Sequence, residues 1–178
     1  MALLSTFRDE SLLPLHQGGR RTTAPPSPDK SKHYVTFNFT DGDNVEWVDG
    51  EHPGAEFFSG PRFWGSQARG SMAMNWGIGP DQRDLGQPIV EYLYATATKP
   101  GPSDGSPSDF YVATEPISYT YPTRFADSDR LKNAQNMNVF MGDMDLNVLN
   151  MVVYKESFDR VGHIFGHYLQ TLGLQVWH

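Results

Sequence analysis

From His33 onward, the chain alternates between segments with a strand pattern and segments with a helix pattern. The expected strands are rich in β-branched and aromatic residues and cover 33–39, 71–78, 110–114 and 147–154, with a fifth beginning at 174. The expected helices carry apolar residues at helical spacing and cover about 86–96, 127–141 and 158–172. This alternation predicts an α/β fold with a mostly parallel sheet and right-handed crossovers.

The length of the chain limits how far such a sheet can close. A complete eight-stranded β/α barrel usually takes about 250 residues, whereas this chain has 178 residues and about four βα units. We therefore expect a partial (β/α)-barrel-like domain, which is either an open sheet or part of a larger protein.

The first 32 residues differ in composition from the rest. Their end, GGRRTTAPPSPDKSK, is rich in Gly, Pro, Ser and charge, which is typical of a linker. We expect a flexible leader over 1–32 and a single α/β domain over 33–178, although Leu12, Leu13 and Leu15 could dock as a short extended piece. The first residues carry an acidic pair where a signal peptide would have its apolar centre. Either the protein is cytosolic or the chain lacks its natural beginning.

Composition argues against several classes of function. The formal charge is −7 and the basic residues are few and scattered, so we expect no nucleic-acid partner. No apolar run approaches the roughly 20 residues that cross a bilayer, so we expect no membrane span. We also expect no cofactor, because the sequence shows neither a phosphate-cradling glycine loop nor a G-x-S-x-G nucleophile motif.

A metal site is not expected either. There is no cysteine, and the pair His163 and His167 lacks the intervening glutamate of a zinc-binding HExxH helix. We interpret the two histidines as a solvated pair opposite the apolar stripe of their helix.

Carboxylates follow the first expected strand directly. The strand 33–39 is followed by Asp41, Asp43 and Asn44 with only Gly42 intervening. The carboxyl ends of parallel strands are where open α/β sheets and β/α barrels keep their ligand sites. In an extended stretch Asp41 and Asp43 point to the same side, where two like charges raise each other's pKa or share a cation. Ordinary turn and capping chemistry is the alternative explanation.

Other chemically useful side chains follow the remaining strands. They are Asn75 and Trp76 near the end of the second strand, Glu115, Tyr119 and Tyr121 after the third, and Lys155 and Glu156 after the fourth. Carboxylates, amides and aromatic rings on one edge suit a neutral, hydroxyl-rich ligand such as a carbohydrate. The alternative is that about half of them only cap and pack loop ends.

Three motifs in order, YVTFNFTDGDN, MNWGI followed by a proline, and YTYP, give the chain a family resemblance. From His33 to Trp177 it resembles the C-terminal domain of the glycoside hydrolases named for a GxGYxYP motif. The resemblance implies that Asp41, Asp43 and Asn44 belong to the site, with Trp76, Tyr119 and Tyr121 nearby. It also implies a larger extracellular or periplasmic bacterial protein with an additional N-terminal domain.

The name-giving motif departs from the family pattern. Here it reads PISYTYP, with Pro116 and Ser118 in place of the two glycines. Proline supplies neither an amide donor nor a positive φ, so the loop must run differently.

These observations lead to one main hypothesis of function. We expect a glycosidase-type hydrolase of a neutral glycan, with Asp41, Asp43 and Glu115 as catalytic carboxylates and Glu156 as a possible second acid. Its expected substrate contacts are amides, a carboxylate and aromatic rings, namely Asn44, Asn75, Trp76, Tyr119, Tyr121 and Glu156. The distance between the two catalytic carboxyl groups would determine the stereochemistry of hydrolysis. About 5 Å is expected for retention of the anomeric configuration and about 6.5–9.5 Å for its inversion.

Two alternatives stay open. One is a non-catalytic carbohydrate-binding or structural module that keeps the cleft but has no turnover. The altered GxGYxYP motif favours this alternative. A metal-assisted deacetylase ranks last, because it needs histidine ligands on the same face as Asp41 and Asp43, and none is evident in the sequence.

Overall fold

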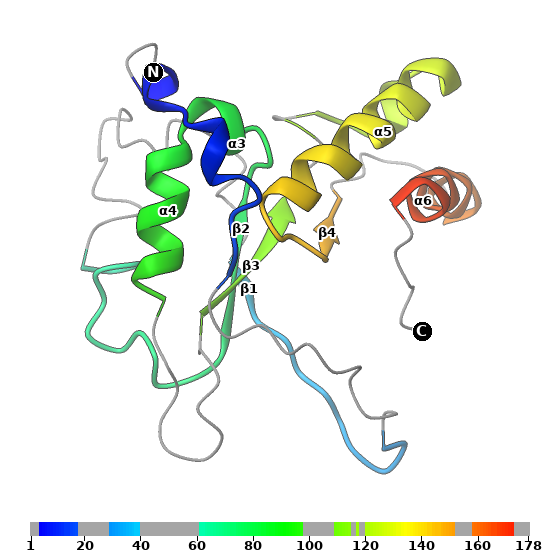
Figure 1. Ribbon diagram of the computed structural model, residues 1–178. Coiled ribbons are helices and arrows are strands. Elements are labelled where there is room, and N and C mark those ends of the chain that lie inside the picture. Colours follow the sequence, from blue (N-terminus) through cyan, green and yellow to red (C-terminus); the bar gives the residue numbers. More distant parts are fainter. Residues whose placement is uncertain are drawn as a thin grey trace.

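The computed structural model describes residues 4–17, 29–39, 61–97, 109–114, 117, 120–151 and 158–172. Within them, four strands form one sheet in the order β1-β2-β3-β4, and every neighbouring pair is parallel. The strands are β1 (Asn38–Phe39), β2 (Met74–Ile78), β3 (Asp109–Thr114) and β4 (Leu149–Asn150). The sheet is curled into a half-barrel (Figure 1), which confirms the expected α/β fold with partial barrel character.

Helices alternate with these strands along the chain. They are α3 (Gln82–Leu85), α4 (Gln87–Ala95), α5 (Asp127–Asp143) and α6 (Phe158–Leu172), with short 3-10 turns η1 (Leu4–Phe7), η2 (Glu10–Leu12) and η4 (Pro122–Arg124). Proline in the first turn of α4 costs no hydrogen bond, which explains why this helix begins beside Gly86 as the sequence predicts. Helix α5 buries Ala134, Met137 and Met141 along one stripe, and it packs against α6 (Figure 1).

The two faces of the sheet carry different side chains. Alternation along the strands places Trp76, Ile78, Tyr111 and Ala113 on one face. These four residues are buried in an apolar cluster with residues of α4, α5 and α6, so we call it the helix face. The opposite face, which we call the inner face, carries Gly77 and the side chains of six other strand residues: Asn38, Asn75, Phe110, Val112, Thr114 and Asn150.

The N-terminal segment 4–17 belongs to the predicted leader, whose leucines could dock as a short extended piece, and it packs against the domain. Leu15 is buried, and its N–H donates to Asp143 O at 2.7 Å. The side chain of Gln17 bonds Tyr111 twice, from Tyr111 N–H to Oε1 at 2.8 Å and from Nε2 to Tyr111 O at 3.2 Å. A glutamine amide offers the same donor and acceptor pair as a neighbouring strand, so a polar sequence can still complete a sheet edge. The boundaries of the domain at 33 and 178 stay predictions.

The first strand is shorter than its sequence suggests. Tyr34, Val35 and Phe37 are exposed, and regular pairing begins only at Asn38. The O of Phe37 still accepts a hydrogen bond from Asn75 N–H at 3.0 Å. Residues with high β-propensity form strands where they can pack against neighbours. Among the described residues, β1 is an edge strand with a neighbour on one side only, so it offers less packing than its sequence suggests. The expected fifth strand lies outside the described residues.

Candidate functional site

The carboxyl edge of the sheet presents polar atoms that the described fold leaves unpaired. Thr114 ends β3 and Asn150 ends β4, and the two residues are register partners on the inner face. Thr114 Oγ1 and Asn150 Nδ2 are both buried and have no hydrogen-bond partner in the described part of the chain. An unsatisfied buried polar atom costs about 1–3 kcal/mol. A fold that keeps two side by side therefore gives up stability at this edge.

Two further unpaired groups follow the same ends of the strands. Gln82 opens α3 shortly after β2, and Thr123 lies in η4, which follows β3. Both are fully buried, and neither the amide atoms of Gln82 nor Thr123 Oγ1 finds a partner among the described residues. Strands β2, β3 and β4 are thus each associated with an unsatisfied polar side chain at or beyond their carboxyl ends.

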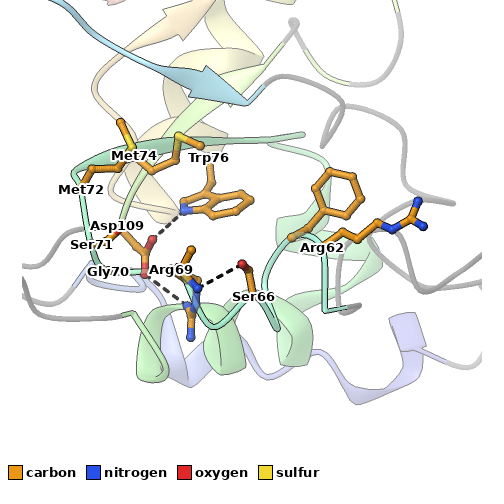
Figure 2. A pocket seen from close by; sticks show the side chains of 11 residues that line it. Arg62, Ser66, Arg69, Gly70, Ser71, Met72, Met74, Trp76 and Asp109 are labelled. Carbon is orange, nitrogen blue, oxygen red and sulfur yellow. Dashed lines mark hydrogen bonds and ion pairs between the residues drawn. The ribbon is translucent and has the colours of Figure 1, made fainter.

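At the amino edge, the buried polar side chains are paired instead. The carboxylate of Asp109, the first residue of β3, accepts a hydrogen bond from Trp76 Nε1 at 2.8 Å. It also forms an ion pair with Arg69 Nη1 at 3.2 Å (Figure 2). The Arg69 guanidinium also stacks on Trp64, 3.8 Å from the ring centroid, and donates to Thr96 O at 3.3 Å. In β/α barrels, the amino edge of the sheet contributes to stability, whereas the active site lies at the carboxyl edge.

A cavity of about 180 Å³ opens beside this network. Its lining is mainly apolar and includes Phe63. Met72 and Met74 lie beside the ring of Trp76, and the Arg62 side chain extends away from Asp109 (Figure 2). The cavity belongs to the amino edge. Among the described residues that line it, the one carboxylate is Asp109, which Trp76 and Arg69 already engage, so this lining does not supply the pair of carboxylates that hydrolysis of a glycosidic bond requires.

Buried tyrosines connect the sheet to its helices. Burial raises the pKa of Tyr94 and of Tyr111, and the neighbouring carboxylates of Asp145 and Asp109, respectively, raise them further. Tyr111 OH donates to Leu93 O at 2.8 Å, and Tyr94 OH donates to Met144 O at 2.5 Å. Both phenols serve as donors: Tyr111 holds α4 to the sheet, and Tyr94 holds α4 to the end of α5.

Six of the nine sequence-predicted site residues lie outside the described residues: Asp41, Asp43, Asn44, Glu115, Tyr119 and Glu156. Their positions in the sequence relate them to the described strands. Asp41 follows the last residue of β1 by two positions, and Glu115 follows the last residue of β3 directly. Their catalytic and binding roles stay predictions.

The other three predicted residues do not come together. β2 continues to Ile78, so Asn75 and Trp76 are its second and third residues rather than lying at its end. Asn75 is on the inner face and donates to Asn38 Oδ1 at 2.8 Å, whereas the Trp76 ring is on the helix face and 4% exposed. Tyr121 is half-buried just before η4.

The altered family motif has an unusual backbone. Ile117, between the two positions where the motif has glycine, adopts a positive φ of 42°. A β-branched residue in this region is strained, and such strain collects at functional sites. The sequence indicates that Pro116 cannot take a positive φ, but it does not indicate that Ile117, the residue after it, would.

Thr114 and Asn150 are functional candidates that sequence reasoning missed. Both occupy expected strands, 110–114 and 147–154, whereas the site residues predicted for these two strands follow them. The sequence offers a signal for Thr114, which closes the expected strand 110–114, but none for Asn150, which is an interior residue of the expected strand 147–154. Only the strand register, however, shows that the two are neighbours.

Comparison with known proteins agrees with this fold. Residues 31–175 match a family model described as "GxGYxYP putative glycoside hydrolase C-terminal domain". The chain belongs to this family. The resemblance expected from the three motifs is thereby confirmed. A comparison with curated proteins finds no match.

A solved structure shares the fold of this GxGYxYP domain. It is a "putative hydrolase" from Bacteroides thetaiotaomicron, with a TM-score of 0.72 and 21% sequence identity. The match covers 98% of this chain and 30% of that protein, so the chain spans less than a third of the solved relative. In the described part of the chain, no helix is long and apolar enough to cross a membrane.

Proposed function

We propose that this GxGYxYP domain supplies the carboxyl-edge part of a glycoside hydrolase site that acts on a neutral glycan. The observation that carries the proposal is the contrast between the two edges of the sheet. Asp109, at the amino edge, is fully engaged by Trp76 and Arg69, whereas Thr114 and Asn150 at the carboxyl edge keep unpaired polar atoms. Family membership supplies the reaction class.

The catalytic carboxylates we propose are Asp41, Asp43 and Glu115. Strand β1 runs parallel to β2 and β3, so the chain leaves Phe39 in the direction of the carboxyl edge. Asp41 is two residues further on, which limits its Cα to within about 7.6 Å of the Phe39 Cα. Glu115 is one residue beyond Thr114, so its Cα is about 3.8 Å from that of Thr114.

In this proposal the acid and base work is divided between carboxylates from different strands. One carboxyl group protonates the glycosidic oxygen, and the other attacks the anomeric carbon or activates water. Asn44, Tyr119, Tyr121 and Glu156 are the proposed substrate contacts. We assign Asn75 and Trp76 to holding the sheet, because both are bonded within the fold near its amino edge.

The test is hydrolysis of aryl glycosides and neutral polysaccharides by the full chain and its variants. Asp41→Asn, Asp43→Asn and Glu115→Gln are each expected to lower kcat/KM about 100-fold or more, because a positioned acid or base contributes that much. Asp129→Asn is the matched control, since Asp129 is exposed on α5, and it should retain full activity. Equal turnover by all four variants and the wild type would refute the assignment.

The altered motif favours a second candidate, a carbohydrate-binding module without turnover. The strained Ile117 lies in the loop after β3, where the family has its glycine motif. This candidate predicts saturable glycan binding by the wild type with no hydrolysis, and equal affinity in Asp43→Asn.

A further inference from the structure

The cavity of about 180 Å³ at the amino edge of the sheet has no part in the proposed hydrolase site. Three exposed residues of its lining, Arg62, Ala68 and Met72, form its mouth, and Met72 is 48% exposed. A small molecule can therefore enter from solvent. An apolar protein cavity of about 150 Å³ binds one benzene molecule, so this cavity is large enough for one six-membered ring.

The wall at the back of the cavity is a rigid aromatic cluster. The Trp76 ring is buried, and the hydrogen bond from its Nε1 to Asp109 fixes its edge. The rings of Phe39 and Trp64 pack against it, with centroids 5.4 and 5.3 Å away. The Arg69 guanidinium in turn covers Trp64. A ring held by so many partners does not collapse into the space in front of it, so the cavity is preformed.

The remaining apolar walls suit an aromatic ligand. Met72 and Met74 lie beside the Trp76 ring (Figure 2), and Phe63 also lines the cavity. Methionine adapts its shape to a ligand, and its sulfur makes favourable contacts with aromatic rings. Tryptophan and phenylalanine add offset or edge-to-face contacts with such a ring. The lining thus favours a flat aromatic ring over a saturated ring of the same size.

Three polar side chains of the described lining are already engaged. Asp109 and Arg69 form an ion pair with each other, and Ser66 Oγ accepts from Ala68 N–H at 3.2 Å. The Arg62 side chain extends away from Asp109 (Figure 2). A sugar ring would bring several hydroxyl groups into a lining with few free partners, and a buried polar group without a partner is costly. A ligand carboxylate would lie close to the carboxylate of Asp109.

We propose that this cavity binds a small uncharged aromatic molecule of one ring, packed against Trp76 and the two methionines. A single polar substituent of the ring stays at the mouth. The cavity lies at the amino edge of the sheet, whereas the proposed hydrolase site lies at the carboxyl edge. The inference therefore goes beyond the proposed function and does not rest on it.

The test is an NMR titration of the full chain that follows the backbone amides of 68–76 and the indole N–H of Trp76. Benzyl alcohol is expected to give shifts that saturate at these positions. Cyclohexylmethanol, its saturated counterpart, should bind about 2- to 10-fold more weakly, because it lacks the ring–ring and sulfur–ring contacts. Benzoate should also bind more weakly than benzyl alcohol, and methyl glucoside should cause no shifts at these positions.

A substitution at the mouth locates the ligand independently. Met72→Asp replaces an apolar contact with a charge and should weaken binding of benzyl alcohol about 5-fold or more. Met72→Leu keeps an apolar side chain and should retain the affinity within about 3-fold. Leu12→Asp is the matched control, because Leu12 is 47% exposed and is not part of the described lining, and it should leave the affinity unchanged.

Three results would each overturn the inference. One is shifts at 68–76 that grow with the concentration of benzyl alcohol without saturating. The second is equal affinity of cyclohexylmethanol and benzyl alcohol, and the third is wild-type affinity in a folded Met72→Asp variant. None of them changes the hydrolysis expected at the carboxyl edge, so this inference and the proposed function can fail separately.

Discussion

Asp109 and Thr114 are the two ends of one six-residue strand, and their polar atoms have opposite surroundings. The Asp109 carboxylate is buried with both Trp76 and Arg69 as partners, which is the condition under which a buried charge is tolerated. Thr114 Oγ1 is buried without one in the described part of the chain. At the scale of single residues, this difference distinguishes the end of the strand that stabilises from the end that we propose binds substrate.

The buried tyrosines give a residue-scale prediction about pH. An unfolded tyrosine titrates with a pKa of about 10, and burial raises the pKa of Tyr94 and Tyr111 above this value in the folded state. Their contribution to stability is therefore complete below about pH 10 and is lost as the pH rises further. We expect the free energy of unfolding to fall in this range, by up to about 1.4 kcal/mol per pH unit for each such group.

Urea unfolding at a series of alkaline pH values, with tyrosinate absorbance as a second signal, measures this effect. Tyr94→Phe should make the fall less steep, while Tyr92→Phe on the exposed side of the same helix should not. A free energy of unfolding that stays constant above pH 10 would contradict the prediction.

At the scale of elements, the helices were more predictable than the strands. The apolar stripe of α6 and the proline of α4 gave the bounds of these two helices to within two residues, because helical periodicity is a local property. β1 was not predictable in the same way. Tyr34, Val35 and Phe37 look like a buried strand but are exposed, since whether a strand packs depends on neighbours that are distant in sequence.

The N-terminal segment 4–17 is the element whose role the sequence conceals most. Its residues show no apolar periodicity, yet they lie against α3 and α4 (Figure 1). Arg8 pairs with Asp84 there at 3.2 Å. Gln17 then bonds the backbone of Tyr111 beside β4. No local pattern reveals that one glutamine takes the place of a strand, because the match is between one side chain and a distant backbone.

Replacing Gln17 tests this element. Gln17→Ala removes the bonds to the N–H and O of Tyr111 and a third, from Nε2 to Asp145 O at 2.8 Å. We expect a loss of about 1–3 kcal/mol in the free energy of unfolding, with faster hydrogen exchange at the Tyr111 amide. His16→Ala, at the exposed neighbouring position, should change neither. Equal stability of the two variants would show that Gln17 does not complete the sheet edge.

At the scale of the whole molecule, the half-barrel gathers the ends of its strands at one edge. Four parallel strands in sequential order bring β1, β2, β3 and β4 to the same side, so residues far apart in sequence can share one ligand. The sequence predicts this gathering from the βα alternation alone. It does not predict that Trp76 faces the helices while Asn75 faces inward, because a shift of one residue in register would exchange the two faces.

The most direct measurement of the central claim, that the carboxyl edge binds a glycan, is amide hydrogen exchange of the full chain with and without the oligosaccharide that it prefers. The account predicts slower exchange in the presence of the glycan at 112–114 and 149–151, at the carboxyl ends of β3 and β4. It predicts no change at 68–75, around the Asp109 network at the amino edge. Protection confined to 68–75 would place the ligand at the wrong end of the sheet and contradict the account.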